Sequence, residues 1–262
     1  MKKNQYILVL VLVFSSLFAS VAQQKNSELP KPRNGNTYVV AHRGAHIGIP
    51  ENTIPAFQKA IDLGCDFVEI DVRKTKDGKL VSVHNSTVDA YVTGITGKVN
   101  EFTLAELKAM NIGERVAQEW ENTRIPTVEE ILQLCQGKIG IYLDLKEPHI
   151  EELVSLLKNY NMERDVIWYI PASYIDAIKE VKQLCQEFLP MPDPGEEKNI
   201  ARIVELVHPG ILASDMGALN ENFVKTAHSF NAKVIVDEKK GSEEEWSKIL
   251  EWGTDGIQTD DP

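Results

Sequence analysis

The sequence predicts an α/β fold, a (β/α)8 barrel of the TIM type, with a hairpin insertion at residues 67–84. Short, almost continuously apolar runs alternate with amphipathic helical patterns over most of the chain. This alternation is typical of a parallel sheet whose strands are covered by helices. The length also fits, because 240 residues follow residue 22 and a barrel of this kind usually takes about 250.

Nine apolar runs follow one another along the chain, most of them separated by a helical pattern. We expect strands at Tyr38–Ala41, Phe67–Val72, Leu80–His84, Lys138–Leu145, Val166–Ile170, Glu187–Pro190, Gly210–Ala213, Lys233–Val236 and Gly256–Thr259. Helical periodicity predicts helices at Thr53–Leu63, Thr127–Cys135, Ile150–Asn159, Ser173–Cys185, Lys198–Val207, Asn220–Phe230 and Ser242–Trp252.

The hairpin accounts for the one run that an eight-stranded barrel does not need. The second and third runs lie too close together for a helical crossover, which takes about a dozen residues. The link between them ends in an Asp-Gly pair, a strong turn signal. Antiparallel pairing across this turn is expected to place Asp71 opposite Ser82. It would also place Glu69 opposite His84 on the same face.

The N-terminus has the three parts of a secretory signal. Two lysines precede an apolar run, Tyr6–Phe18, and small residues follow it, which predicts a signal peptide at residues 1–22. The run is shorter than the roughly 20 residues of a membrane-spanning helix, which disfavours an uncleaved anchor. A polar linker at residues 23–36 then leads to the barrel domain at residues 37–262. We therefore expect an exported protein, periplasmic or secreted.

The charge of the chain limits its partners. It carries 28 basic and 39 acidic residues, a net charge of −11, and removal of the two lysines in residues 1–22 makes this −13. We expect no nucleic-acid partner and no stable membrane association after signal cleavage, because both surfaces are anionic. A small-molecule substrate is expected. It can itself be anionic, since a bound cation and a few basic side chains reverse the field inside a cleft.

The first strand ends in His42, Arg43 and Gly44. In a barrel, the carboxyl ends of the strands form the active-site face. A titratable imidazole beside a fixed positive charge suits proton transfer next to an anion. Taken alone the triplet is a weak signal, because a His at a strand end is more often structural.

Three carboxylates interrupt apolar strands near the same face. Glu69 and Asp71 are two residues apart and share one face of their strand, and Asp144 lies near the end of another. Crowded like charges require a cation or protonation to relieve them. Oxygen ligands without clustered Cys or His favour one divalent cation, Ca²⁺ or Mg²⁺, over zinc. Lys146, two residues after Asp144, is expected to hold a substrate phosphate oxygen.

His84 closes the third run and brings a second imidazole to the same barrel mouth. The whole set suits cleavage of a phosphodiester. Positive groups would bear the charge of the pentavalent phosphorus species. One imidazole would take a proton from the nucleophile, and the other would give one to the leaving alkoxide.

These residues belong to a set of motifs that resembles the glycerophosphodiester phosphodiesterase family, relatives of the phosphatidylinositol-specific phospholipases C. The set covers most of the mature chain and is specific in this order. Its motifs are His42-Arg43-Gly44, Pro50-Glu51-Asn52-Thr53, Glu69-Ile70-Asp71-Val72, Thr75-Lys76-Asp77-Gly78, His84, Ile125-Pro126-Thr127 and Asp255-Gly256-Ile257-Gln258-Thr259-Asp260.

The resemblance implies a barrel fold, a divalent cation and hydrolysis to glycerol 3-phosphate and an alcohol. It also implies that His42 and His84 form the acid–base pair, that Glu69 and Asp71 bind the metal, and that Arg43 holds the phosphate. 

Glu51 belongs to a motif that doubles as a helix start, with Asn52 or Thr53 as the capping residue. Two interpretations of Glu51 follow from this position. It is either a purely structural residue or an acid that lies just behind the metal ligands, and we expect the latter.

The chain departs from the usual family pattern at several places. Asp144 stands where Glu is usual, and its shorter arm would move the metal or admit a water. Asn85 replaces the Asp that usually follows the second His, and no Arg occurs in the stretch 88–91. Val236 and Asp237 replace a Trp-Thr pair, which removes an aromatic wall. These departures leave the hydrolytic residues intact and bear on the substrate.

Two other functions stand beside hydrolysis. A lyase of the phospholipase C or sphingomyelinase D type uses a hydroxyl of the substrate as nucleophile and gives a cyclic phosphate. A non-catalytic periplasmic binding protein keeps the pocket but is expected to lack some of the His and acidic residues, and this sequence has the full set. The sequence does not distinguish water from an internal hydroxyl as the nucleophile.

Overall fold

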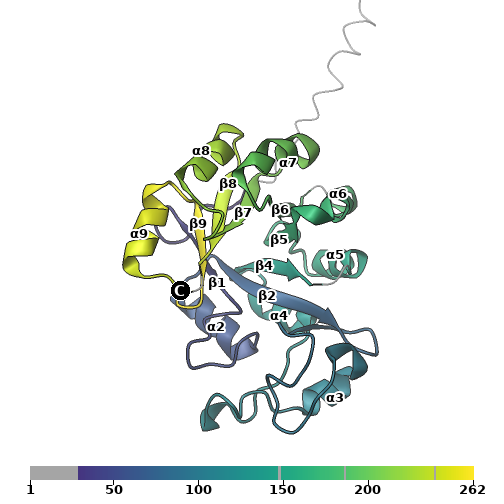
Figure 1. The fold of residues 1–262 in the computed structure, drawn as a ribbon. Helices are drawn as coiled ribbons and strands as arrows, with labels where there is room; N and C mark the ends of the chain where they lie inside the picture. The colour runs from purple at the N-terminus through teal and green to yellow at the C-terminus, as the bar shows by residue number, and fades with distance from the viewer. Residues whose placement is uncertain (1–28, 147–148, 186, 239) are drawn as a thin grey trace, which may run out of the picture.

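Parallel strands form a nearly closed ring that helices surround (Figure 1). The computed structural model describes residues 29–262 except 147–148, 186 and 239. The predicted signal peptide, residues 1–22, lies outside the described residues. Among those described, no helix is long and apolar enough to cross a membrane.

Each predicted apolar run overlaps a strand of the structure, and the predicted barrel is confirmed. The ring strands are β1 (Tyr38–Ala41), β2 (Phe67–Lys74), β4 (Gly140–Leu145), β5 (Val166–Pro171), β6 (Leu189–Asp193), β7 (Ile211–Asp215), β8 (Lys233–Asp237) and β9 (Gly256–Thr259). The additional strand, β3 (Leu80–Ser82), lies off the ring and pairs with β2.

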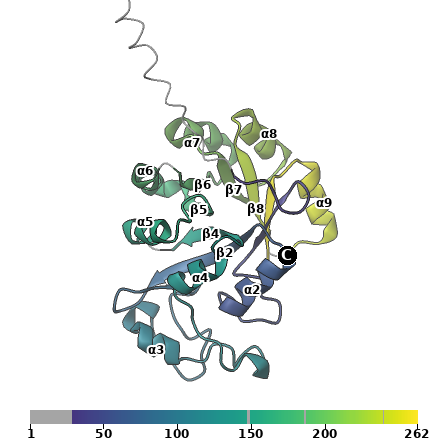
Figure 2. The same cartoon turned by 180° about the vertical axis from the view of Figure 1, so that it is seen from behind.

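Helices lie between the ring strands and cover their outer face, as the second view also shows (Figure 2). Most begin at a polar residue whose side chain accepts a backbone N–H, for example Thr53, Thr127 and Ser242. The helices are α2 (Ile54–Leu63), α3 (Leu104–Ala109), α4 (Val128–Cys135), α5 (Ile150–Asn159), α6 (Ile175–Leu184), α7 (Ile200–Val207), α8 (Glu221–Ser229) and α9 (Glu243–Glu251).

The hydrogen-bonded order of the ring is β6-β5-β4-β2-β1-β9-β8-β7. β6 and β7 lie side by side, but among the described strands no ladder joins them. Pro190 and Pro192 lie two residues apart in β6 and therefore present the same edge of the strand. Proline has no N–H to donate, which explains why the ladder path ends at β6.

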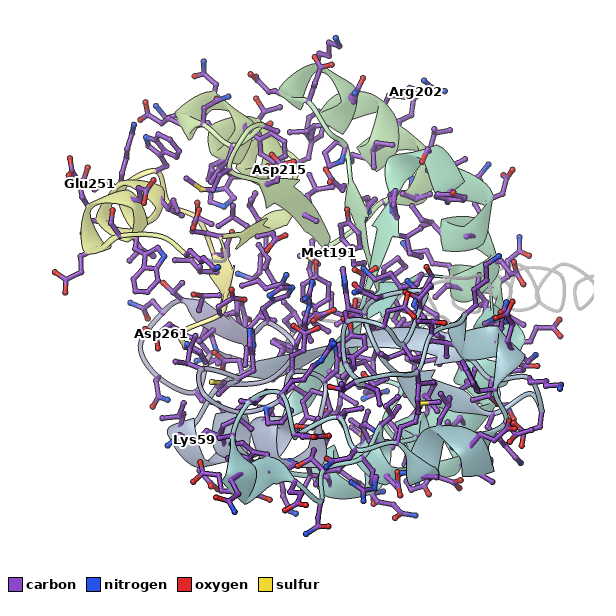
Figure 3. All side chains as sticks on the ribbon, turned by 60° about the horizontal axis from the view of Figure 1, so that its bottom comes forward. Lys59, Met191, Arg202, Asp215, Glu251 and Asp261 are labelled. Carbon is purple, nitrogen blue, oxygen red and sulfur yellow. The ribbon has the colours of Figure 1, made fainter. Side chains whose placement is uncertain are left out.

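Alternation along the strands divides the apolar residues into two layers. Side chains such as Val40, Phe67, Ile167 and Met191 fill the inside of the ring, and Met191 lies near its centre (Figure 3). The outward faces of the same strands pack against the helices. Val68 of β2, for example, belongs to this outer layer of the core. Near the carboxyl ends of the strands, the inward positions change from apolar to charged residues, so the barrel interior opens into a polar mouth.

β2 and β3 form the predicted antiparallel hairpin, but the predicted register was wrong. Ser82 pairs with Val72 instead of Asp71, a shift of one residue. The loop between the strands holds Thr75, whose hydroxyl donates to the Asp77 carboxylate at 2.6 Å and accepts the Lys79 N–H at 2.9 Å. β3 ends at Ser82, two residues earlier than predicted, so His84 lies on a loop and not opposite Glu69.

The chain between β3 and α4 forms an insertion with a small apolar core of its own. This core contains Val83, Val88, Leu107 and Ile125, all buried. The insertion includes α3, which the sequence analysis did not predict because only six residues are helical. In both views the insertion lies beside β2 and α4, on the side of the barrel away from α7 and α8 (Figures 1 and 2).

Candidate active site

The predicted site residues gather at the carboxyl ends of the first ring strands. His42 follows β1, Glu69 and Asp71 lie on β2, and Asp144 lies on β4. Asp71 and Asp144 are register partners on adjacent strands, which places their side chains next to each other. The strands therefore bring together groups that are about 70 residues apart in the sequence.

Glu69, Asp71 and Asp144 form an acidic cluster in which the nearest carboxylate oxygens all lie within 4.8 Å of one another. Glu69 and Asp71 are only 2% and 1% exposed. Burial, followed by the charges of Asp71 and Asp144, raises the pKa of Glu69 well above its ordinary value. Full ionisation of all three carboxylates is therefore unfavourable unless positive charge is placed next to them.

Lys146 compensates part of this charge. Its Nζ lies 3.0 Å from Asp71 Oδ1 and 2.5 Å from Asp144 Oδ2. Burial opposes ionisation of Asp71, but Lys146 and Asn52 outweigh it and lower the pKa of Asp71. The pKa of Asp144 is raised, because burial outweighs the effect of Lys146 there. One ammonium group therefore leaves the three carboxylates incompletely neutralised.

The donor set fits a divalent cation. All three groups are carboxylates, and buried Oδ1 of Asp71 accepts no well-aligned hydrogen bond within the described residues. Hard oxygen donors of this kind select Ca²⁺ or Mg²⁺ over softer metals. Glu69, Asp71 and Asp144 are the residues that would hold such an ion.

Asn52 orients Asp71. Its Nδ2 donates to Asp71 Oδ2 at 2.7 Å, and its Oδ1 accepts the hydroxyl of Ser82 at 2.6 Å. Asn52 has a φ of +54°, and Thr53, not Asn52, caps α2. Asn52 and Thr53 were the two candidate caps of this helix. Thr53 caps it, and the Asn52 side chain instead holds Asp71 in place.

Arg43 lies in a tight turn that directs both its backbone and its side chain at acids. Its N–H donates to Glu69 Oε2 at 2.8 Å, and its Nη1 donates to Glu51 Oε2 at 2.9 Å. Its Nε lies 3.6 Å from Asp71 Oδ2. Glu51 is therefore linked to the cluster through Arg43, and the structure does not place it against the three carboxylates directly.

Gly44 makes this turn possible. It has a φ of +82°, in the left-handed region, and the preceding residue, Arg43, also has a positive φ of +53°. A Cβ on Gly44 would lie 2.7 Å from the carbonyl carbon of Ala56 in α2. Only glycine allows the turn to pack so closely against this helix.

His42 is buried and paired with an acid that the sequence analysis did not assign to the site. Its Nδ1 lies 2.5 Å from Oδ1 of Asp260, and His46 Nε2 lies 3.7 Å from the same oxygen. Burial lowers the pKa of His42, although the bond to Asp260 opposes this effect. The available signal was the position of Asp260, directly after the last strand, where barrel strands present their functional side chains.

His84 lies on the loop after β3. Its Nδ1 lies 3.0 Å from Asn85 Oδ1, and its backbone carbonyl accepts Nε and Nη2 of Arg73 at 3.0 and 2.6 Å. These contacts hold the loop and the imidazole of His84 at the edge of the barrel mouth. His84 is also among the charges that favour the ionised form of Asp71, which places it near the acidic cluster.

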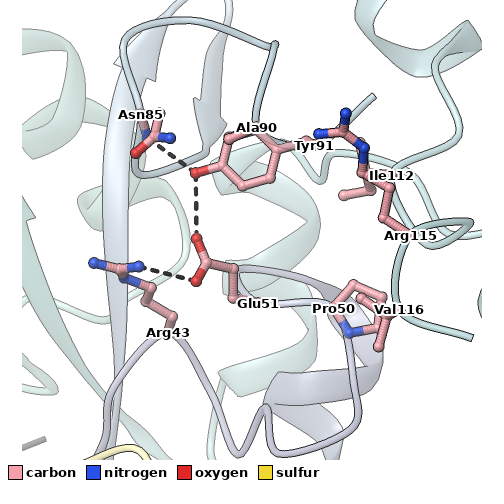
Figure 4. A pocket seen from close by; sticks show the side chains of 9 residues that line it. All are labelled: Arg43, Pro50, Glu51, Asn85, Ala90, Tyr91, Ile112, Arg115 and Val116. Atoms are coloured by element: carbon pink, nitrogen blue, oxygen red, sulfur yellow. Dashed lines mark hydrogen bonds and ion pairs between the residues drawn. The ribbon is translucent and has the colours of Figure 1, made fainter. Parts of the chain in front are cut away.

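A pocket of about 350 Å³ opens beside Arg43 (Figure 4). Arg43 and Glu51 line it from the barrel, and Asn85, Tyr91 and Arg115 line it from the insertion. Glu51 accepts hydrogen bonds from both Arg43 and the hydroxyl of Tyr91. The pocket is thus a space next to the charged mouth, shared by the barrel and the insertion.

The sequence and the fold both resemble known phosphodiesterases. A glycerophosphodiester phosphodiesterase from Caldanaerobacter subterraneus subsp. tengcongensis is 33% identical over 247 residues, which cover 86% of this chain and 95% of the relative. A phosphodiesterase from Oleispira antarctica, in complex with the product sn-glycerol-3-phosphate, is 26% identical and superposes with a TM-score of 0.77, over 86% of this chain and 93% of that one.

A glycerophosphodiester phosphodiesterase from Thermotoga maritima is also 26% identical and has a TM-score of 0.69, over 87% of this chain and 96% of that one. The profile of the Glycerophosphoryl diester phosphodiesterase family matches residues 42–262, most of the chain. The chain therefore belongs to the glycerophosphoryl diester phosphodiesterase family, as the motifs in its sequence predicted.

Proposed function

We propose that this phosphodiester hydrolase cleaves glycerophosphodiesters to sn-glycerol 3-phosphate and an alcohol with the help of one divalent cation. The observation that carries the proposal is the convergence of Glu69, Asp71 and Asp144 within 4.8 Å, with Lys146 beside them and Arg43 bound to two of them. A relative named for this activity, and a phosphodiesterase of similar fold in complex with its product sn-glycerol-3-phosphate, support the choice of substrate.

The basic residues are suited to hold the phosphate. The side chains of Arg43 and Lys146 both lie next to Asp71 in the acidic cluster. Their positive charges can therefore attract a phosphate that approaches the three carboxylates. A bound Ca²⁺ or Mg²⁺ would supply further positive charge to the phosphate oxygens and reduce the repulsion among its ligands. Without these positive charges, the acidic mouth would repel the substrate.

Two imidazoles are suited to move protons. His42 is held by Asp260, and burial lowers its pKa, so the neutral form that accepts a proton from water predominates at neutral pH. His84, held by Asn85, is assigned to donate a proton to the leaving alkoxide. We expect His42→Ala and His84→Ala each to lower kcat by about a hundredfold or more. A variant with a near-normal rate would remove that residue from the mechanism.

The decisive experiment is a turnover screen. The protein is stripped of metal with EDTA and then assayed on glycerophosphocholine, -ethanolamine, -glycerol and -inositol, with Ca²⁺ or Mg²⁺ added back. We expect turnover that depends on one of these ions and releases glycerol 3-phosphate. Full activity in excess EDTA, or no turnover of any substrate, would contradict the proposal. Phosphorus NMR of the products distinguishes hydrolysis from a lyase reaction, since only the latter gives a cyclic phosphate.

A further inference from the structure

The pocket between the barrel and the insertion lies directly next to the proposed reaction centre. Arg43 belongs to both, since it lines the pocket and contacts Glu69 and Asp71. Asn85 also lines the pocket and directly follows His84, which it binds. A diester held at the acidic cluster therefore has one of its two alcohol arms within reach of this pocket.

The charged residues of the pocket lining favour a ligand with acceptor oxygens. Arg43 and Arg115 bring two guanidinium groups, and among the described residues that line the pocket Glu51 is the one acid. Both oxygens of Glu51 are already bound, one by Arg43 at 2.9 Å and one by Tyr91 at 3.2 Å. Arg115 donates from Nη1 to the carbonyl of Asp89 at 2.6 Å, and a guanidinium has five N–H donors in all.

The remaining lining is apolar and the space is small. Pro50, Ala90, Ile112 and Val116 line the pocket together with the polar groups. Its volume of about 350 Å³ corresponds to roughly twelve water molecules at about 30 Å³ each. An alcohol with a compact carbon skeleton and several hydroxyl groups matches this combination of apolar wall and hydrogen-bond donors.

We propose that this pocket binds the alcohol arm of the substrate and selects uncharged polyols, such as glycerol or inositol, over trimethylammonium alcohols. Arg115 donates hydrogen bonds to the hydroxyl groups, and the two guanidinium groups disfavour a cationic arm. The inference rests on the proposed hydrolysis of glycerophosphodiesters and adds the class of alcohol to it.

The test compares Arg115→Met with the matched control Arg202→Met, on the exposed outer helix α7 (Figure 3). Each is assayed with glycerophosphoglycerol, glycerophosphoinositol and glycerophosphocholine. We expect kcat/KM of Arg115→Met to fall about tenfold or more for the two polyol diesters, from the loss of hydrogen bonds to a charged group. The value for glycerophosphocholine should not fall and should rise if anything, because one of the two charges that repel its trimethylammonium group is gone, whereas Arg202→Met should match the wild type for all three substrates.

An equal loss for all three substrates would overturn the proposal, because the pocket would then hold the shared glycerol arm. A wild-type preference for glycerophosphocholine would overturn it as well. If the wild type cleaves none of the three, the proposed function itself fails, which is a different result. 

A second variant tests the size of the pocket. Ala90 is exposed and lines the pocket, so Ala90→Leu fills space without disturbing the core. We expect it to lower kcat/KM for the inositol diester more than for the glycerol diester, with an unchanged circular dichroism spectrum. Equal rates for the two substrates in both proteins would contradict the assignment.

Discussion

The ionisation of His42 depends on two opposing contacts. Burial lowers its pKa, and the carboxylate of Asp260, 2.5 Å from Nδ1, raises it in part. The same carboxylate fixes the orientation of the ring and directs the other ring nitrogen away from Asp260. One aspartate after the last strand thus controls both the charge and the direction of an imidazole on the first.

Asp260→Asn is expected to separate these effects. Loss of the carboxylate lowers the pKa of His42 further, because the contact that raised it is gone. The acid limb of the pH–rate profile should therefore move to lower pH, and kcat should fall on the order of a hundredfold as the ring loses its orientation. Asp261→Asn, next to it on the exposed side, serves as the control. An unchanged acid limb would exclude Asp260 as the partner of His42.

The acidic cluster leads to a prediction about stability. A divalent ion that binds only the folded protein stabilises it by about 2.7 kcal/mol when its concentration is 100-fold above Kd. The melting temperature of the EDTA-treated protein should therefore rise on addition of Ca²⁺ or Mg²⁺. Glu69→Gln should abolish the rise, because it removes a buried ligand, whereas Glu251→Gln on α9 should retain it. A metal-dependent rise that persists in Glu69→Gln would contradict the ligand assignment.

Individual site residues were predictable from the sequence where strand alternation alone determines their place. Glu69, Asp71 and Asp144 interrupt apolar strands, so their common face could be inferred. The supporting residues could not be inferred in this way. Asp260 meets His42 across 218 residues of sequence, and the role of Asn52 depends on contacts with two different strands.

At the scale of elements, the turn between β1 and α2 connects the fold to the site. The turn places the Arg43 N–H on Glu69 and brings Asn52 to Asp71, while Gly44 packs against the first turns of α2. The helix, capped by Thr53, supplies the rigid surface on which the turn rests. Changes in this contact should therefore reach the acidic cluster as well as the stability of the fold.

Gly44→Ala tests this contact. A residue other than glycine at φ +82° costs about 1–2 kcal/mol, and here the added Cβ would also meet Ala56 at 2.7 Å. Gly48→Ala is a matched control, because Gly48 has a φ of +74° but nothing within 4 Å of an added Cβ. In urea unfolding, Gly44→Ala should lose more stability than Gly48→Ala. Equal losses would show that the close packing against α2 contributes nothing.

Strands and helices with clear periodicity were predicted well, whereas the hairpin register was not. The error arose because the turn was located only by its Asp-Gly pair. In the structure, side-chain bonds of Thr75 and Asp77 set a five-residue loop from Thr75 to Lys79, which shifts the pairing by one. α3 was missed for a related reason: it is a short helix that depends on a capping box of Thr103 with Glu106 and on the small core of the insertion.

At the scale of the whole molecule, the net charge of the chain bears on whether it cleaves free diesters or phospholipids in a membrane. The net charge of −11 disfavours approach to anionic membranes. Glycerophosphoglycerol should therefore be cleaved faster than micelles of phosphatidylglycerol, the anionic diacyl phospholipid with the same head group. Faster cleavage of the micellar lipid would instead favour a phospholipase.

We further propose that residues 1–22 direct export. A reporter that is active only outside the cytoplasm, fused after residue 36, should require these residues for activity. The same fusion without residues 1–22 is the control, and equal reporter activity of the two fusions would contradict export by this segment.

Within the described part of the chain, β6 and β7 lie side by side without a ladder between them, and this affects how the ring fluctuates. Backbone hydrogen bonds hold every other neighbouring pair in the order of the ring, so thermal opening should begin between these two strands. Amide protons along the seam are expected to exchange with deuterium sooner than those between β1 and β2. Because Glu69, Asp71 and Asp144 stand on β2 and β4, further round the ring, such breathing would widen the mouth while the acidic cluster keeps its geometry.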